Sequence, residues 1–229
     1  MPRTPEDLLK ITPVWRRLGG VDRSHLAGIA RVVTYDRGER LFSEGDPSDF
    51  FITIASGRVK VVKTTAAGKD VILEVFGTGD PLGAVASYEG RPFPASAIAL
   101  EPTTCVVVPR REFFALLEHH PSLVRGLLLG LTIRLVELTN RVVDLTGGKV
   151  EPRFARLFLK LADESGEAAE EGIAVRVPLS RQDLADLAGT TIETSIRIMS
   201  RWGKEGLVRT ERDGFVILDR RGLETLASE

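Results

Sequence analysis

Two residues in the C-terminal part of the chain have the types and the spacing needed to read DNA bases. Glu193 and Arg197 are four positions apart and Arg201 follows four later, so a helix would place all three on one face. An arginine can donate two hydrogen bonds to guanine, and a glutamate can accept one from N4 of cytosine. Ile192 and Ile196 share this face, where thymine methyl groups could cover them. The alternative is a solvent-exposed Glu193–Arg197 ion pair, which contributes only about 0.3–0.5 kcal/mol.

The elements that would hold this face are two short helices joined by a tight turn. Ser180 is a suitable N-cap for a first helix that runs to Ala188, and Gly189 supplies the turn. The second helix starts at Thr190 or Thr191. The residues that it would bury are Ile198, Met199 and Trp202. This arrangement predicts a helix-turn-helix, whose second helix can enter a major groove.

A β-hairpin is predicted directly after the second helix. Two apolar runs, residues 207–210 and 215–218, flank the turn sequence Arg212-Asp213-Gly214. A helix-turn-helix followed by such a hairpin is typical of a winged helix. Short polar side chains and one arginine near the helix starts would bind DNA phosphates and fix the register; they are Ser180, Arg181, Gln182, Thr191 and Thr194.

A heptad stripe occupies the middle of the chain. Residues 121–146 contain no helix breaker except Gly126 and Gly130, and Gly147-Gly148 ends the predicted helix. Apolar side chains recur with alternating steps of four and three at Val124, Leu128, Leu131, Leu135, Leu138, Val142 and Leu145. This spacing favours pairing with a second copy of the helix, which predicts a parallel homodimer. The alternative is a helix that lies on the β-domain of its own subunit.

The N-terminal half is predicted to be rich in short strands. Between residues 32 and 109, turn sequences separate six apolar runs, at 40–42, 50–54, 59–62, 71–75, 96–100 and 104–108. Many short strands of this kind predict a barrel or roll. Two amphipathic stretches, 5–10 and 22–30, would pack against it. After the long helix, a short amphipathic helix around Phe154 and Leu161 precedes an acidic segment, 163–172, that is predicted to be a loop.

Composition excludes several classes of protein. The chain has 229 residues, a net charge of −1 and one cysteine, Cys105, so an internal disulfide and a cysteine-rich metal cluster are ruled out. Its apolar runs are far shorter than the roughly 20 residues of a membrane span. We therefore expect a soluble, cytoplasmic protein with no membrane partner.

An enzyme with a cupin-like roll would need clustered histidine ligands, and residues 32–109 contain no histidine. We expect neither a metal site nor an enzyme. A regulatory module acting only on another protein would have no use for the wing and Arg197.

The sequence resembles the CRP/FNR family of bacterial transcription regulators over nearly its whole length. Residues 38–46 (GERLFSEGD) and 51–61 (FITIASGRVKV) resemble the family's cyclic-nucleotide-binding β-roll, and residues 179–185 (LSRQDLA) with 189–194 (GTTIET) resemble its helix-turn-helix. The resemblance implies an α+β fold with an N-terminal double-stranded β-roll (1–120), a long dimerisation helix (121–147) and a C-terminal winged helix-turn-helix (148–229). It also implies a homodimer on double-stranded DNA, RNA polymerase as a partner, Glu193 and Arg197 as the base-reading pair, and a half-site of the TTG or TGTG type.

The effector pocket departs from the pattern of the cyclic-AMP-binding members of the family. By resemblance, the pocket comprises Gly83, Ala84, Val85, Phe93, Ala95, Ser96, Arg134, Leu138 and Thr139. Ala84 replaces the ribose-binding acid, and Phe93-Pro94 stands where an arginine and a serine would hold the phosphate. A buried phosphate without an arginine partner is poorly compensated, so we expect no cyclic AMP binding.

No cofactor is predicted, and the effector stays unknown. A haem- or small-molecule-sensing member of the same family is the alternative. The histidines are His25, His119 and His120, and the last two read as an interhelical turn rather than as haem ligands. Cys105 reads as a buried strand residue.

Overall fold

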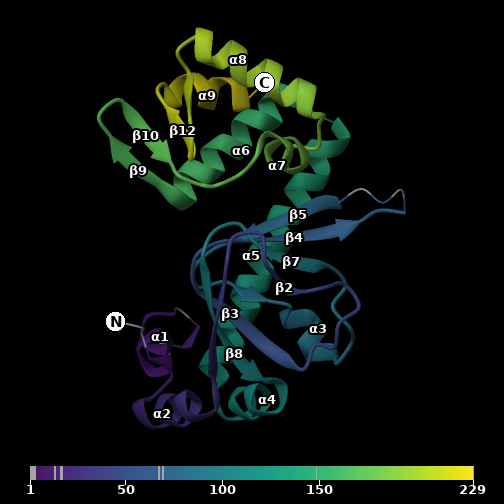
Figure 1. Ribbon diagram of the computed structural model, residues 1–229, viewed down its shortest axis with the longest axis vertical. Helices are drawn as coiled ribbons and strands as arrows, with labels where there is room; N and C mark the ends of the chain where they lie inside the picture. The colour runs from purple at the N-terminus through teal and green to yellow at the C-terminus, as the bar shows by residue number, and fades with distance from the viewer. Residues whose placement is uncertain are drawn as a thin grey trace. The chain divides into compact units, whose positions relative to one another are not determined.

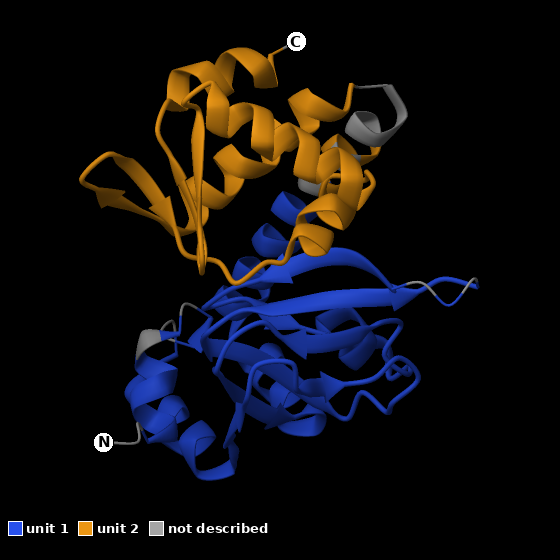
Figure 2. Ribbon diagram, turned by 45° about the horizontal axis from the view of Figure 1, so that its top comes forward, with its two compact units in different colours: residues 1–135 blue, residues 136–229 orange. Residues whose placement is uncertain are grey.

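The chain forms two compact units, residues 1–135 and residues 136–229 (Figure 2). The computed structural model describes residues 4–12, 14–15, 18–66, 68, 70–147 and 149–228, and only the backbone of 11, 137, 141 and 143–147. Each unit has its own hydrophobic core. The boundary between them falls inside the long helix. The expected division into three parts, at 120/121 and 147/148, separates the chain by function and stays a prediction.

The first unit is built around a roll of two four-stranded antiparallel sheets (Figure 1). One sheet has the order β1-β8-β3-β6 and the other β2-β7-β4-β5. The strands are β1 (Arg31–Tyr35), β2 (Arg40–Phe42), β3 (Phe50–Ser56), β4 (Val59–Thr64), β5 (Asp70–Phe76), β6 (Pro81–Leu82), β7 (Ser96–Ala99) and β8 (Thr103–Pro109). All six predicted strands are present, and β1 and β6 are additional, so the β-roll expected from the sequence is confirmed.

Strand β3 is buried on both faces because helices cover one sheet and the second sheet covers its other side. Helices α1 (Pro5–Ile11), α2 (Gly20–Ile29) and α4 (Arg110–His119) contact β8 or β3. Phe51 packs on this helical side, where its ring centroid is 5.5 Å from that of Trp15. Ile52 and Ile54 belong to the other core, between the sheets, together with the free thiol of Cys105. The predicted burial of Cys105 is confirmed.

A single long helix, α5 (Pro121–Gly147), follows α4 as predicted. His120 lies in the turn between the two helices as predicted, whereas His119, predicted to lie in the same turn, is the last residue of α4. Leu123 is buried in the core formed by α1, α2, α4 and the roll, and Leu127 packs against that core. The start of α5 is therefore anchored to the first unit.

The second unit is a winged helix-turn-helix, as the sequence predicts. Its helices are α6 (Val150–Ser165), α7 (Arg181–Leu187), α8 (Ile192–Lys204) and α9 (Arg220–Ala227), and its strands are β9 (Gly166–Ala169), β10 (Gly172–Val175), β11 (Val208–Glu211) and β12 (Gly214–Ile217). Phe154, Phe158, Trp202 and Phe215 form the aromatic centre of its core, with ring centroids 4.1–5.7 Å apart.

The prediction of a loop over residues 163–172 is wrong. Helix α6 continues to Ser165, and β9 and β10 form a hairpin that joins the wing in a four-stranded sheet of order β11-β12-β10-β9. All four residues of β9 are exposed, so this edge strand has no alternation of apolar and polar residues. Its backbone hydrogen bonds to β10, rather than a buried face, define it as a strand.

Candidate nucleic-acid interface

Two capped helix starts and one glycine turn set the geometry of the helix-turn-helix. The Ser180 hydroxyl accepts from the Asp183 amide at 3.1 Å, and the Asp183 carboxylate accepts from the Ser180 amide at 2.8 Å. Gly189, with φ of 62°, makes the left-handed turn that a residue with a side chain rarely adopts. Thr191 then caps α8 by accepting from the Thr194 amide at 3.3 Å. The start of α7 lies where the sequence predicts it, and α8 begins at Ile192, one or two residues after the predicted start at Thr190 or Thr191.

The buried face of α8 fixes which of its residues point outward. Ile198, Met199 and Trp202 are buried in the core of the second unit, as predicted. The indole nitrogen of Trp202 also donates to the Glu151 carboxylate of α6 at 2.8 Å. Because these contacts fix the rotation of α8 about its axis, the opposite face is presented outward in one orientation.

Glu193, Ile196 and Arg197 lie together on that outward face. They line a hollow of about 420 Å³ with Ser200, Arg201 and Lys204. Ile196 is 50% exposed, whereas Ile192 is half-buried. In the described part of the chain, Arg197 has no carboxylate partner, so the alternative of a Glu193–Arg197 ion pair is not formed. Hydrogen bonds from its own backbone amide and from Thr191 lower the pKa of Glu193, which keeps it an ionised acceptor.

Arg201 is engaged within the domain. Its guanidinium forms an ion pair with Glu151, the same carboxylate that accepts from Trp202. The sequence places Arg201 on the DNA-facing side, and this role stays a prediction. The pair joins residues fifty positions apart, so no local pattern could have revealed it.

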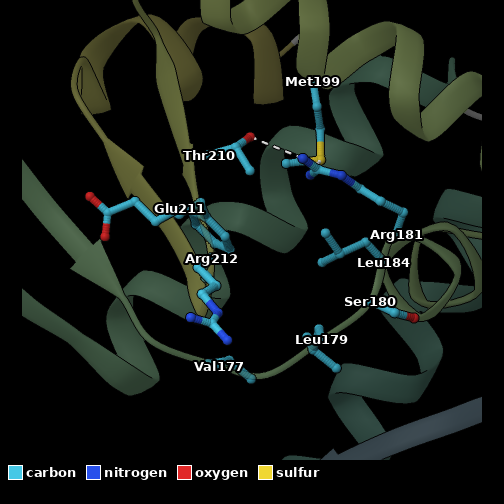
Figure 3. A pocket seen from close by; sticks show the side chains of 11 residues that line it. Val177, Leu179, Ser180, Arg181, Leu184, Met199, Thr210, Glu211 and Arg212 are labelled. Atoms are coloured by element: carbon cyan, nitrogen blue, oxygen red, sulfur yellow. Dashed lines mark hydrogen bonds between the residues drawn. The ribbon is translucent and has the colours of Figure 1, made fainter.

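The predicted phosphate-binding residues lie at the two helix starts, but several are engaged locally. The Ser180 hydroxyl donates to Asp183 at 2.7 Å, and the Gln182 amide donates to Asp186 at 2.8 Å. Arg181 donates to Thr210 of the wing at 3.1 Å and contacts the sulfur of Met199 (Figure 3). Burial lowers the pKa of Arg181.

The structure adds residues to this surface that the sequence reasoning did not select. Ser200 and Lys204 line the hollow on α8, at helical spacing from Arg197. Arg212 is exposed in the wing turn, between β11 and β12. The predicted hairpin turn contained Arg212, and its position at the tip was the available signal.

In the roll, two of the residues expected to form the effector pocket, Gly83 and Phe93, pack on each other. Gly83 has a left-handed φ of 65° and starts the short helix α3 (Ala84–Glu89). Phe93 is buried against it and stacks on Phe42 with ring centroids 3.8 Å apart. A Cβ at Gly83 would lie 2.3 Å from the Phe93 ring, which shows how closely the ring covers the start of α3.

The structure also shows the burial and contacts of other residues predicted to line the pocket. Ala95 is buried, Val85 is 57% exposed, and the buried Ser96 hydroxyl accepts from the Glu44 amide at 2.9 Å. Leu138 and Thr139 belong to the second unit, so their membership of the pocket stays a prediction.

Arginines near this region are already bound to other groups. The Arg134 guanidinium lies 3.9 Å from the centroid of the Phe76 ring and 3.7 Å from the Glu74 carboxylate. Arg91 is largely exposed and pairs with Glu89 at 3.3 Å. Arg110 donates to the Ser87 carbonyl at 2.5 Å. Each of these guanidinium groups therefore already contacts another group of the chain, and the Arg91 pair lies on the surface.

The heptad stripe of α5 is exposed over most of its described length. Leu128, Leu131, Leu135, Leu138 and Val142 are 44–65% exposed, and Val124 is half-buried. Leu129, Ile133 and Val136 are exposed as well, so the apolar surface is wider than the predicted stripe. The side chain of Leu145, and Gly148 after it, lie outside the described residues. The stripe does not pack on the roll of its own subunit at Leu128 and Leu131, because these two residues belong to neither core of the first unit.

Other chemistries find little support among the described residues. Within them, no group of three or more histidine, cysteine and acidic side chains could hold a metal ion. His119 contacts the Ala115 carbonyl at 2.8 Å, and His120 lies 3.4 Å from the Asp22 carboxylate. Over the same part of the chain, no helix has the length and apolar character to cross a membrane.

Two family models match the chain, and they fall on the two units described above. The cyclic nucleotide-binding domain matches residues 32–120, and the Crp-like helix-turn-helix domain matches residues 152–226. The CRP-like cAMP-activated global transcriptional regulator of Mycobacterium tuberculosis is 29% identical over 209 residues, which are 89% of this chain and 92% of the relative. The cyclic AMP receptor protein of Thermus thermophilus is 29% identical and covers 76% of this chain and 78% of its own. The structure of FixK2 from Bradyrhizobium japonicum matches with a TM-score of 0.77 at 22% identity, covering 86% of this chain and 97% of that one.

Proposed function

Because this chain belongs to the CRP/FNR family of DNA-binding transcription regulators, which are not enzymes, we propose that it binds an inverted-repeat promoter site as a homodimer. The exposed apolar stripe of α5 supports the dimer. In a free chain, five side chains that are 44–65% exposed would leave a large apolar surface in water, and a symmetric helix pair would cover it. A two-fold dimer presents two copies of α8 to successive major grooves, with half-sites about 34 Å apart. From such a site it would act on RNA polymerase at the promoter.

The observation that carries the DNA-reading proposal is the outward face of α8. Arg197 has no carboxylate partner among the described residues, so it keeps its donors for a base. The Glu193 carboxylate accepts from its own amide and from Thr191, but it has about four acceptor positions and can accept a further hydrogen bond from a base. We assign Arg197 to a guanine and Glu193 to a cytosine. Ile196 is apolar and half exposed beside them, which suits the methyl group of a thymine. Thr191 and Thr194, at the start of α8, are proposed to bind the neighbouring phosphates, with Ser180 and Gln182 at the start of α7.

Binding selection from random double-stranded DNA tests this proposal. We expect an inverted repeat in which each half-site has a G·C pair at a fixed place and a thymine beside it. Replacing that thymine by deoxyuridine removes only the methyl group and should weaken binding by about 0.8 kcal/mol, the value of one buried carbon. Recovery of sequences with no shared motif would overturn the proposal.

We further propose that the roll does not take cyclic AMP, although the two relatives named above carry that nucleotide in their names. The space at the start of α3 is taken by Phe93, and Arg134 is committed to Glu74 and Phe76. A cyclic phosphate placed there would lose its hydration without gaining a free guanidinium. The effector would then be a different small molecule, sensed through the same roll, or none.

A further inference from the structure

Arg181 joins three elements of the winged domain. It is the first residue of α7, its guanidinium donates to the Thr210 hydroxyl on β11 at 3.1 Å, and it contacts the sulfur of Met199 on α8 (Figure 3). The pocket around these groups has a volume of about 210 Å³, and the apolar residues Val177, Leu184 and Phe215 form part of its wall. The arginine is therefore partly buried, with its guanidinium held against the wing and α8.

The wing is bound on its other face by a different arginine. Side chains of Arg209 and Thr210 point to opposite sides of β11, because successive residues of a strand alternate. Arg209 forms an ion pair with Glu171, in the turn between β9 and β10. One face of β11 is thus tied to the β9–β10 hairpin, and the other face is tied through Thr210 to the helix-turn-helix.

Arg212 is an exposed cation of the wing, and it lines the same pocket as Arg181 (Figure 3). It is exposed in the turn between β11 and β12, and within the described residues it has no carboxylate partner. Its distance from a bound duplex depends on the angle at which the hairpin leaves the domain. A hydrogen bond between α7 and β11 would restrict that angle.

We propose that Arg181 is a positioning residue for the wing and that Arg212, held in place by it, is the phosphate contact. The proposal rests on the DNA binding proposed above. It assigns to Arg181 a role different from the direct phosphate contact expected from its place at the start of α7. A partly buried guanidinium would have to abandon Thr210 and Met199 to reach a phosphate, whereas Arg212 is already exposed.

A double-mutant cycle on the full-length protein separates the two roles. We would measure the slope of log affinity against log salt for Arg181→Met, Arg212→Ala and the double variant on a selected inverted repeat. Each phosphate contact contributes about 0.9 to this slope, so losing one contact in each subunit lowers it by about 1.8. We expect both single variants and the double variant to show the same loss of about 1.8. A loss of about 3.6 in the double variant, or an unchanged slope for Arg181→Met, would overturn the proposal.

Thr210 provides a matched pair of variants that keep every charge. Thr210→Val removes the acceptor of Arg181 and should reproduce the loss of slope seen with Arg181→Met, while Thr210→Ser keeps the hydroxyl and should bind DNA like the original protein. If Thr210→Val binds like the original protein, Arg181 does not act through the wing. This pair keeps the test valid even if Arg181→Met destabilises the domain.

Hydrogen exchange without DNA distinguishes failure of this inference from failure of the proposed function. Amides of β11 and β12 should exchange faster in Arg181→Met and Thr210→Val than in the original protein, while those of α6 stay unchanged. Unchanged exchange in the wing refutes the positioning role. Absence of specific DNA binding in the original protein would instead refute the proposed function.

Discussion

The two candidate sites of this protein use their charged and aromatic groups in opposite ways. On the outward face of α8, Arg197 has no carboxylate partner among the described residues and Ile196 is half exposed. In the roll, Phe93 stacks on Phe42, and Arg134 is bound to Glu74 and Phe76. Arg197 and Ile196 on the first surface are therefore available to a ligand, whereas Phe93 and Arg134 at the second site already contact other residues of the chain.

This difference has a direct energetic meaning. A site whose polar groups are satisfied internally gains little from a charged ligand, because each new hydrogen bond replaces an existing one. A surface with an unpaired guanidinium and an exposed isoleucine gains both hydrogen bonds and apolar burial on binding. The stripe of α5 resembles the surface of α8 in this respect, since Leu128 and Leu131 are 57% and 45% exposed in the single chain.

The largest effect is expected from a charge placed in the stripe of α5. Leu135 is 65% exposed in the single chain and would face its own copy across the two-fold axis of the dimer. Leu135→Glu would bury two like charges against each other, which costs several kcal/mol. Light scattering should show a monomer, and affinity for the inverted repeat should fall roughly 100-fold or more because the two half-sites are no longer linked.

Ile133→Glu is the matched control for that substitution. Ile133 is 53% exposed on the same helix, but it lies about 200° around the axis from Leu135. We expect this variant to remain a dimer. A dimeric Leu135→Glu variant would show that the stripe is not the interface, and dissociation of the control alone would move the interface to the opposite side of α5.

A smaller effect, but a more specific one, is expected from Arg197→Ala. Each half-site should lose about 1–3 kcal/mol, because a bidentate contact to guanine disappears. The preference for guanine at that position should disappear with it, while the preferences at other positions remain. Quantitative binding to a panel of single-base variants of the selected site measures both quantities.

Arg201→Ala tests whether any arginine on α8 would give the same result. Its guanidinium is paired with Glu151, so its removal should lower the free energy of unfolding without changing the base preferences. Unchanged preferences in Arg197→Ala at every position would mean that the DNA-reading face has been assigned incorrectly.

Local signals explain why the winged domain could be predicted well from the sequence. Ser180, with Asp183 three residues later, marks the start of α7, and Gly189 marks the turn. The apolar spacing of Ile198, Met199 and Trp202 then sets the rotation of α8. All of these signals lie within a few residues of the structure that they specify.

The features that the sequence reasoning missed depend on contacts between distant residues. Strand β9 has four exposed residues and is defined by pairing with β10, so its acidic sequence resembles a loop. The pairs Arg201–Glu151, Arg181–Thr210 and Arg134–Glu74 join residues 29 to 60 positions apart. Nothing in the neighbouring sequence distinguishes an arginine bound in this way from one that is free to meet DNA or an effector.

The smallest effect is expected from addition of cyclic AMP, which tests the roll. The nucleotide should leave the melting temperature of the protein unchanged, because the Phe93 ring fills the space at the start of α3 and the Arg134 guanidinium is already paired with Glu74. With a dissociation constant of 1 µM, the nucleotide at 1 mM would raise the free energy of unfolding by about 4.1 kcal/mol. For a chain of this size, that would raise the melting temperature by about 8 °C or more, a shift that calorimetry resolves easily.

Cyclic GMP serves as the control, since it shares the cyclic phosphate but not the base. A shift with both nucleotides would mean that Arg134 leaves Glu74 to bind the phosphate, and the contrast between a filled roll and an open α8 would then no longer hold. A shift with cyclic AMP alone would place the recognition in the base, on residues outside the Phe93 and Arg134 contacts.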